Sequence, residues 1–287
     1  MEITIRPIVP DDFEDCGRIR YEGFKIVNEQ HGFPPQFPSV EAGVRRIDSL
    51  SNAPSSFGVV AELAGKIAGF AFLTERDPVR AIGPIVIDLG VQSRGIGRRL
   101  MEVLLERARG AKSIRLVQGG FNLQSLSLYA SLGFDVKEPL ITMTGRPTQS
   151  AAKGYLIRHL KETDIAECEA LHMGIVGYSR TNELSDRLAE GSPVVAVRNQ
   201  RVVGYLSSPT RAFDNHGIAD SDEAMQSLLS GAAELTDAPL LFHLPIRYAK
   251  LFRWCLGEKI RAVRPMTLMS IGEYADPRGV YFPSTIY

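Results

Sequence analysis

Two short stretches of the sequence bring together residue types that could do chemistry, and the first is QSRGIG at residues 92–97. It lies between an apolar run at 84–89 and a helix-like stretch at 98–109. The first turn of a helix has unpaired N–H groups and the positive end of the helix dipole, and glycines let a phosphate approach that backbone closely. The spacing excludes the G-x-G-x-x-G dinucleotide loop and the nucleotide-triphosphate loop. The stretch therefore predicts a diphosphate site, with a plain structural turn as the alternative.

The second stretch, NLQSLSLYASLGF at residues 122–134, combines a helix cap with a tyrosine. Asn122 is a residue type that caps helix N-termini, and Gly133 suits the C-terminal end of the same helix. Tyr129 lies seven residues after Asn122, on the same helical face after two turns. A tyrosine placed in this way is a candidate proton donor, and a packed core aromatic is the alternative.

Both stretches depend on the strands and helices that position them. Apolar periodicity and turn residues in the first half predict strands at 3–8, 57–62, 66–75, 80–88, 113–118 and 133–145, and helices at 10–30, 39–50, 96–109 and 122–131. On the helix that follows QSRGIG, one core-facing stripe is expected to hold Ile96, Leu100, Val103, Leu104 and Ala108.

The chain contains the same pattern twice. Three pairs of segments correspond in the same order: 5–16 with 157–168, 57–73 with 192–207, and 128–136 with 252–260. Three ordered matches indicate a tandem duplication. We expect one domain at 1–148, a linker at 149–154 and a second domain at 155–287, because the polar and small residues near the boundary suit a linker.

The two chemical stretches resemble the GNAT superfamily of acyl-CoA-dependent N-acyltransferases. Q-x-x-G-x-G opening a helix is similar to the family's pyrophosphate loop, and N-x-x-S-x-x-x-Y-x-x-x-G-F is similar to its second motif. The matching positions are Gln92, Gly95 and Gly97, then Asn122, Ser125, Tyr129, Gly133 and Phe134. IVIDLGVQ also fits the family's V-x-P-x-x-Q, with Leu89 in place of the proline. The resemblance covers 1–148 and implies an α/β fold of two tandem GNAT-type domains, each with a mixed, splayed central sheet flanked by helices.

This resemblance also implies an activity and its site residues. The chain would be an acetyltransferase that uses acetyl-CoA as cosubstrate and needs no metal. Backbone groups of Ile87 and Leu89 would hold the pantetheine arm like an added strand. The diphosphate would lie on the backbone of Gln92, Ser93, Arg94, Gly95, Ile96, Gly97 and Arg98, with the two arginines adding charge at the rim.

The implied reaction is direct attack of an amine on the thioester, without an acyl-enzyme. Tyr129 is the matched acid for the departing thiolate, and Asn122 is the matched polar contact to the pantetheine or to a water relay. Both residues would therefore act in catalysis and in cofactor binding. The enzyme's contribution would be mostly positioning and proton transfer.

No residue is singled out as the base that takes the amine's proton. Strand 80–88 holds no glutamate. Asp88 is there, but its neighbours Ile87 and Leu89 would alternate with it onto the opposite face. Three weaker candidates lie between the first helices, and each has solvated surface as its alternative reading: Glu22, Glu29 and His31.

The second repeat is expected to be a degenerate copy that keeps the fold and lacks the pyrophosphate loop. RAFDNHGIADS at 211–221 stands in the loop's place and has one glycine. Aligning Gly257 with Gly133 puts Ile246 at the position of Asn122 and Arg253 at that of Tyr129, and neither side chain can do the implied work.

Three features of the second repeat are given structural readings. His216 and His243 are interpreted as packing or surface groups, and Trp254 as a core residue. The tail at 277–287 is apolar for a chain end and should be docked. It would either pack along an interdomain cleft or cover the second sheet.

The composition limits which cellular compartment and which kinds of partner are expected for this protein. The chain of 287 residues is 44% hydrophobic and has zero net charge, which excludes the basic field of a nucleic-acid binder. Three cysteines without CxxC spacing argue against a disulfide framework and against a structural zinc site. No segment reaches the ~18 apolar residues of a membrane span. We expect a soluble, cytoplasmic protein without nucleic-acid or membrane partners.

The acceptor is expected to be a small-molecule or peptide amine. Residues 29–39, EQHGFPPQFPS, form a loop rich in proline and phenylalanine, which favours an amine on a partly hydrophobic molecule, with a loop that fills the interdomain seam as the alternative. The alternative function is a non-catalytic acyl-CoA-binding or sensing protein, which the missing base favours. The sequence leaves the oligomeric state open.

Overall fold

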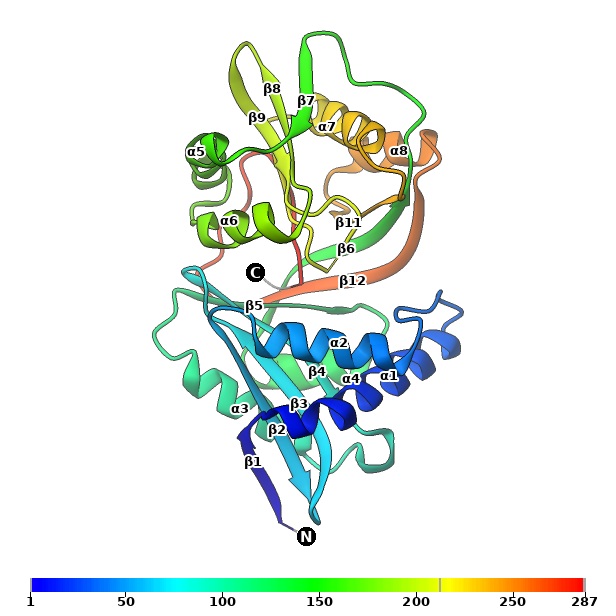
Figure 1. Cartoon of the computed structure of the whole chain (residues 1–287), viewed down its shortest axis with the longest axis vertical. Helices are drawn as coiled ribbons and strands as arrows, with labels where there is room; N and C mark the ends of the chain where they lie inside the picture. The colour runs from blue at the N-terminus through cyan, green and yellow to red at the C-terminus, as the bar shows by residue number, and fades with distance from the viewer. Residues whose placement is uncertain (1, 212, 286–287) are drawn as a thin grey trace. The chain divides into compact units, whose positions relative to one another are not determined.

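A computed structural model of the chain describes residues 2–211 and 213–285 (Figure 1). Its internal contacts divide it into two compact units: Met1–Arg76 with Arg80–Ile114, and Asp77–Val79 with Arg115–Tyr287. Within the described ranges, no helix has the length and apolar character needed to cross a bilayer.

Unit 1 is an antiparallel sheet covered by helices. In chain order its elements are β1 (Ile3–Pro7), η1 (Pro10–Asp12), α1 (Phe13–Gln30), α2 (Val40–Ser51), β2 (Ser56–Leu63), β3 (Lys66–Thr74), β4 (Val79–Ile87), η2 (Leu89–Val91) and α3 (Ile96–Arg107). Its strands lie in the order β1-β2-β3-β4. These bounds confirm the predicted elements of this unit to within three residues.

A core between the helices and the sheet holds unit 1 together. Buried side chains of α1 and α2 pack on β2, β3 and β4: Cys16, Ile19, Ile47, Leu50, Val60, Phe70, Phe72 and Val86. The two helices lie side by side (Figure 1) and cross closely at two glycines. A Cβ atom on Gly43 would lie 2.5 Å from the carbonyl oxygen of Gly17, so both positions need the smallest residue.

Unit 2 holds the end of the first repeat and all of the second. Its elements are β5 (Ser113–Gly119), α4 (Leu123–Ser131), β6 (Asp135–Gly145), β7 (Tyr155–His159), η3 (Glu162–Asp164), α5 (Ile165–Val176), α6 (Thr181–Glu190), β8 (Val194–Arg198), β9 (Arg201–Leu206), β10 (Gly217–Ala219), α7 (Asp222–Glu234), β11 (Leu240–Pro245), α8 (Ala249–Gly257), β12 (Arg261–Gly272) and β13 (Val280–Phe282). Its strands form two runs, β5-β12-β6-β11 and β13-β10-β9-β8-β7.

The last strands of the two repeats are exchanged. β12, which ends the second repeat, lies between β5 and β6 of the first, and β6 pairs with both β12 and β11. β6 therefore pairs on both sides with strands of the second repeat, and the division between compact units falls at Ile114. The boundaries at 148 and 155 describe the sequence repeat and stay a prediction.

The first residues of each repeat make the same ion pair. Arg6 donates to both oxygens of Asp12 at 2.7 Å, and Arg158 donates to both oxygens of Asp164 at 2.6 and 2.8 Å. Each aspartate also accepts the backbone N–H three residues before it, at 2.8 Å. The cysteine four residues later is fully buried in both copies. The repeated Ile-Arg, Asp and Cys therefore form the same ion pair and place the same buried cysteine in both repeats.

The first hairpin is also duplicated, down to its irregularities. Two residues of positive φ form the turn in each copy, Ala64 and Gly65 in one and Asn199 and Gln200 in the other, as a two-residue hairpin requires. The register then shifts by one residue after Ala61 in the first copy and after Ala196 in the second. A shared bulge confirms the tandem duplication at the level of backbone register.

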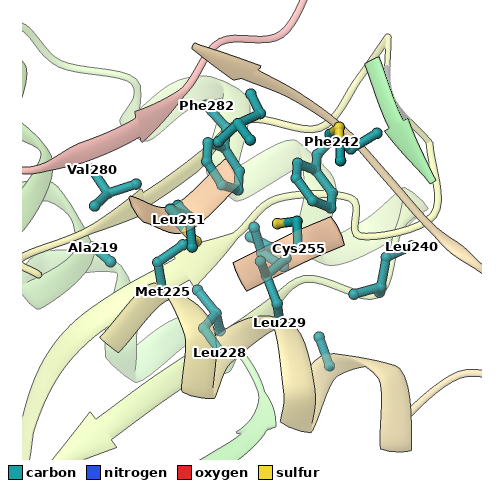
Figure 2. Close-up of a cluster of buried hydrophobic side chains, with 14 of the residues drawn as sticks. Ala219, Met225, Leu228, Leu229, Leu240, Phe242, Leu251, Cys255, Val280 and Phe282 are labelled. Carbon is teal, nitrogen blue, oxygen red and sulfur yellow. The ribbon is translucent and has the colours of Figure 1, made fainter. Parts of the chain in front are cut away.

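The tail completes the sheet of the second repeat. β13 pairs antiparallel with β10, and Phe282 is fully buried in the main core cluster of unit 2. Figure 2 shows this cluster, in which Phe282 of β13 lies against Phe242 of β11. The tail is therefore docked, as expected, but it joins the second sheet as a strand and does not cover a face of that sheet.

Candidate functional site

In unit 1 the predicted diphosphate loop follows β4 directly. The N–H of Asp88 donates to the carbonyl of Ala68 at 2.9 Å, which closes the β3–β4 ladder. The Asp88 carboxylate then accepts the N–H of Gly90 at 2.9 Å and caps η2. Asp88 is therefore a loop-forming residue at the end of the strand.

The loop turns into α3 through two residues of left-handed backbone. Gly95 is the N-cap of α3 with a φ of 79°, a conformation that glycine adopts at little cost. Ser93 has a φ of 64°, which costs a non-glycine residue about 1 kcal/mol or more. Residues 92–95 are exposed. Strain of this kind is typical of loops shaped for a ligand.

Buried apolar side chains hold the start of α3 against the sheet. Ile96 and Leu100 are buried, and α3 packs on β1, β2 and β3. Arg99 makes the first helical bond, from its N–H to the carbonyl of Gly95 at 3.2 Å. The N–H groups of Ile96 and Gly97 precede that bond and point out of the first turn, as an anion site requires.

The predicted apolar stripe of α3 needs one correction. Met101 is fully buried on this helix, whereas Val103 is only partly buried and lies beside Arg99 in a shallow hollow. The rim of the loop is basic, since Arg94 and Arg98 are both exposed. Arg99 donates from its side chain to the carbonyl of Ile3 at 2.8 Å and thereby ties α3 to β1.

The end of β4 is held close to β3 by a glycine. Ile87 pairs with Gly69, and a Cβ atom on Gly69 would lie 2.7 Å from the carbonyl oxygen of Val86. The β3–β4 register shifts between Ala71 and Leu73. Ile87 and Leu89, predicted to hold the pantetheine arm, are partly buried on either side of Asp88.

Asn122 lies in unit 2, at the N-terminus of α4. Its side-chain oxygen accepts the N–H of Ser125 at 3.0 Å, which confirms the predicted cap. The Ser125 hydroxyl donates to Gln118 at 2.8 Å and fixes the helix start to β5. Within the described ranges no hydrogen bond is found for the side-chain amide nitrogen of Asn122, so this group can make a further polar contact.

Tyr129 lies on the buried side of α4 with its side chain 8% exposed. Its ring meets that of Phe134 edge to face, with centroids 6.2 Å apart. Burial raises the pKa of the phenol to about 12, so Tyr129 stays protonated at physiological pH. Among the residues that the structure describes, no hydrogen-bond partner of its hydroxyl is found.

The base candidates named from the sequence all have structural contacts. Arg18 of α1 lies 3.1 Å from Glu22 and 3.5 Å from Asp88. Glu29 lies 4.0 Å from Lys25, and the His31 ring contacts the carbonyl of Val27 at 2.8 Å. None of these contacts singles out one group as the base.

Sequence reasoning missed several buried carboxylates, among them Glu138 of β6. It is 3% exposed, and burial raises its pKa while Arg247 opposes the shift. Arg247 lies 2.5 Å from it, and Tyr274 donates to it at 3.4 Å. Glu138 follows Asp135 and Lys137 in the charged start of β6, so its residue type and position gave no signal in the sequence.

The second repeat lacks the loop by deletion. A Cβ atom on Gly204 would lie 2.9 Å from the carbonyl of Ile218, the same relation as Gly69 with Val86, so Ala219 matches Ile87 and Asp220 matches Asp88. Six residues, 89–94, separate Asp88 from the N-cap of α3, whereas Asp220 is followed directly by Ser221, the N-cap of α7. The stretch at 211–221, read as a loop, contains β10.

The alignment of α4 with α8 in the structure also differs from the one predicted from the sequence. α4 and α8 each have nine residues, and the left-handed residue after the helix is Gly133 in one and Lys259 in the other. Tyr248 therefore takes the place of Asn122 and Cys255 that of Tyr129. The predicted equivalents Ile246 and Arg253 were wrong because Gly257, used as the anchor, is the last helical residue.

His216 and His243 of the second repeat are packing groups, not surface ones. His216 is fully buried between the Tyr205 hydroxyl at 2.9 Å and Glu183 at 3.1 Å. His243 is also buried and contacts Thr142 at 3.1 Å. Trp254 packs against the main core as predicted. The described residues contain no group of three or more His, Cys, Asp or Glu that could hold a metal ion.

Comparison with known proteins agrees with this geometry. Residues 22–134 match the acetyltransferase (GNAT) family, a stretch that includes β2–β4, the glycine loop, Asn122 and Tyr129. The first repeat is a GNAT domain. The GNAT match ends at Phe134, the last residue of the second motif.

The repeat architecture also has counterparts among known proteins. An uncharacterized N-acetyltransferase, YitH of Bacillus subtilis, is 24% identical over 60% of this chain and 62% of its own length. A putative acetyltransferase from Pyrococcus horikoshii matches 99% of this chain and 95% of its own, with a TM-score of 0.76 at 20% identity. A tandem GNAT protein from the clavulanic acid biosynthesis pathway matches 94% of this chain and 98% of its own, with a TM-score of 0.59 at 13% identity. The chain thus has a tandem GNAT fold.

Proposed function

We propose that this chain is an N-acetyltransferase that transfers an acetyl group from acetyl-CoA to a primary amine by direct attack in a ternary complex. The observation that carries the proposal is the loop between β4 and α3. It has left-handed backbone at Ser93 and Gly95 and is absent at the matching strand end of the second repeat. A loop kept in one copy and deleted from the other has a role beyond folding.

The loop's chemistry suits the diphosphate of coenzyme A. In the proposal, backbone N–H groups of residues 92–98 bind the phosphate oxygens at the positive end of α3. Exposed Arg94 and Arg98 add positive charge. Ile87 and Leu89 offer backbone groups to the pantetheine arm, and Asn122 offers its side-chain amide.

Proton transfer is assigned to Tyr129. The amine nitrogen attacks the thioester carbonyl carbon, the C–S bond breaks, and the departing thiolate takes the phenolic proton. Because burial raises the pKa of Tyr129 to about 12, the group is protonated when the thiolate forms. The amine's own proton leaves to a base or to water.

The acceptor proposed is an amine on a partly hydrophobic small molecule. The loop after α1 carries aromatic side chains that pack on that helix, and Phe37 meets Phe24 edge to face at 5.7 Å. The guanidinium of Arg20 lies 4.5 Å from the Phe37 ring centroid. The aromatic residues of this loop support the acceptor class named here.

The proposal is tested by following thiol release from acetyl-CoA with a panel of apolar primary amines. We expect turnover in the natural chain, and we expect Gly97→Glu to lose it because a carboxylate on the first turn repels the diphosphate. Gly97→Gln adds the same bulk without charge, so its affinity for acetyl-CoA should exceed that of Gly97→Glu by at least about tenfold. Equal activity in all three proteins would refute the loop's assignment.

A second candidate function is a non-catalytic acyl-CoA-binding or sensing protein. The absence of a distinguished base among the described residues favours it. In that case acetyl-CoA would bind at the loop with the same dependence on residue 97, while no amine in the panel would release thiol.

A further inference from the structure

The C-terminal strand lies between two strands of the second repeat. β13 hydrogen-bonds to β10, with Val280 opposite Ala219. On its other side, Phe282 stacks on Phe242 of β11 (Figure 2). The ring centroids are 4.8 Å apart and the planes differ by 8°. β13 therefore fills the space between β10 and β11.

This position corresponds to the one proposed for pantetheine in the first repeat. β10 matches β4, and Ala219 matches Ile87 because Gly204 approaches the carbonyl of the preceding residue as Gly69 does. In the first repeat, the backbone of Ile87 is proposed to hold the pantetheine arm like an added strand. In the second repeat, Ala219 is paired with a real added strand.

A second contact supports the same correspondence independently. Tyr248, the N-cap of α8, stands where Asn122 stands on α4. Its hydroxyl donates to the carbonyl of Gly279 at 2.8 Å and accepts the N–H of Tyr281 at 3.2 Å. Of the three positions proposed to touch pantetheine in the first repeat, Ile87 and Asn122 thus have counterparts that touch the tail in the second, and Leu89 lies in the loop that the second repeat lacks.

We propose that residues 279–285 occupy the second repeat's counterpart of the pantetheine slot and thereby exclude acyl-CoA from that repeat. The inference rests on the proposed function, because acyl-CoA in the first repeat defines the slot. Pantetheine and an extended peptide share the needed chemistry, since both present amide groups along an extended chain that can pair with a strand edge.

The tail is firmly held beyond β13. The Ser284 hydroxyl accepts from Arg180 at 3.0 Å, and the N–H of Thr285 donates to the carbonyl of Phe213 at 3.0 Å. Val280, Tyr281 and Phe282 are each at most 2% exposed. An acyl-CoA in solution would have to displace all of these contacts.

Two variants expose the slot by different means. One ends at Asp276. The other is the full chain with Gly279→Val, in which the new side chain would clash, because a Cβ atom there would lie 2.7 Å from the carbonyl of Ala219. The control is Gly174→Ala on α5, where an added Cβ meets nothing within 4 Å.

Pantetheine binding is measured by calorimetry, together with amide hydrogen exchange of β10. We expect the natural chain and Gly174→Ala to keep β10 protected and to show no second pantetheine site. Each slot variant should lose that protection and gain one pantetheine site, from which a synthetic peptide of residues 277–287 displaces the ligand. If the shortened chain does not fold, the Gly279→Val variant alone tests whether an exposed slot binds pantetheine.

A folded variant that exposes β10 and takes the peptide but no pantetheine would overturn the inference. The tail would then be only another strand of the sheet. Failure of the proposed function has a different signature, since the natural chain would bind no acetyl-CoA at the loop of the first repeat.

Discussion

At the scale of single residues, the sequence predicted the groups with a local backbone signature. Asn122 caps α4 as expected, and Gly95 has the positive φ that its position in the loop suggested. The left-handed Ser93 was not predictable, because serine has no preference for that backbone region. The equivalents of Asn122 and Tyr129 in the second repeat were misplaced by two residues, because a lysine occupies the left-handed position where glycine was expected.

Tyr129→Phe separates a chemical role from a packing role. The variant keeps the edge-to-face contact with Phe134 and removes a hydroxyl that has no hydrogen-bond partner among the described residues. We expect the free energy of unfolding to change by less than about 0.5 kcal/mol, while kcat falls by about 10²- to 10⁴-fold. Acetyl-CoA affinity should be nearly unchanged.

Steady-state kinetics and urea unfolding provide these two readouts. Tyr155→Phe removes a partly buried phenol from the second repeat and serves as the control, with no expected loss of kcat. Unchanged turnover in Tyr129→Phe would remove this residue as the acid and leave it a core aromatic.

At the scale of elements, local patterns predicted the helices and strands of the first repeat well. The exchange of β6 and β12 was not predictable, because the choice between two strands of similar sequence depends on long-range packing and not on local periodicity. The deletion before α7 was recognised from the missing glycines, but the strand β10 was hidden in the stretch read as a loop. It has three residues, too few for a periodic signal.

The Arg–Asp ion pair at the start of each repeat should be important for stability. Hydrogen bonds from Arg158 lower the pKa of Asp164. A lowered folded-state pKa means that this stabilisation is present above the unfolded value and is lost as pH falls through the folded value. We expect Asp164→Asn to lower the free energy of unfolding by about 1–3 kcal/mol at neutral pH.

Urea unfolding followed by the fluorescence of Trp254 measures this loss in unit 2. Glu162→Gln, an exposed position on the same turn, is the matched control and should change stability by less than about 0.5 kcal/mol. An Asp164→Asn chain as stable as the natural one at pH 7 would show that the repeated ion pair does not stabilise the fold.

At the scale of the whole molecule, the same fold occurs twice, and the two copies differ in their loops and in their buried polar residues. The first copy keeps a loop suited to a diphosphate, and the second has lost that loop and packs its tail between its own strands. The second copy has instead a buried polar interior around His172, Glu183 and His216. Sequence patterning could not show this interior, because its members come from separate elements and meet only in the fold.

Unit 2 should be sensitive to mild acid because it buries three neutral histidines. Burial lowers the pKa of His216 to about 4 and that of His243 to about 3, and it lowers the pKa of His172 well below its usual value. The unfolded chain binds these protons below about pH 6.5, so stability is lost as pH falls from there toward the folded-state values.

Between pH 7.5 and 5.5, His216 and His243 each contribute about 1.4 kcal/mol to this loss, or roughly 3 kcal/mol together, and His172 adds to the loss in the same direction. Urea unfolding at both pH values, again with Trp254 as the probe, measures it. His243→Gln should reduce the difference by about 1.4 kcal/mol, whereas exposed His159→Gln should leave it unchanged. A difference that is the same in both variants would mean that His243 is already charged in the folded protein.

The asymmetry between the two copies is tested most directly by titrating the chain with acetyl-CoA in a calorimeter. We expect one site per chain, and we expect that site to be lost in Gly97→Glu and weakened less in Gly97→Gln. Two sites would show that the second repeat binds cofactor without the glycine loop and with its tail in place. No binding at all would contradict the assignment of the β4–α3 loop to a diphosphate.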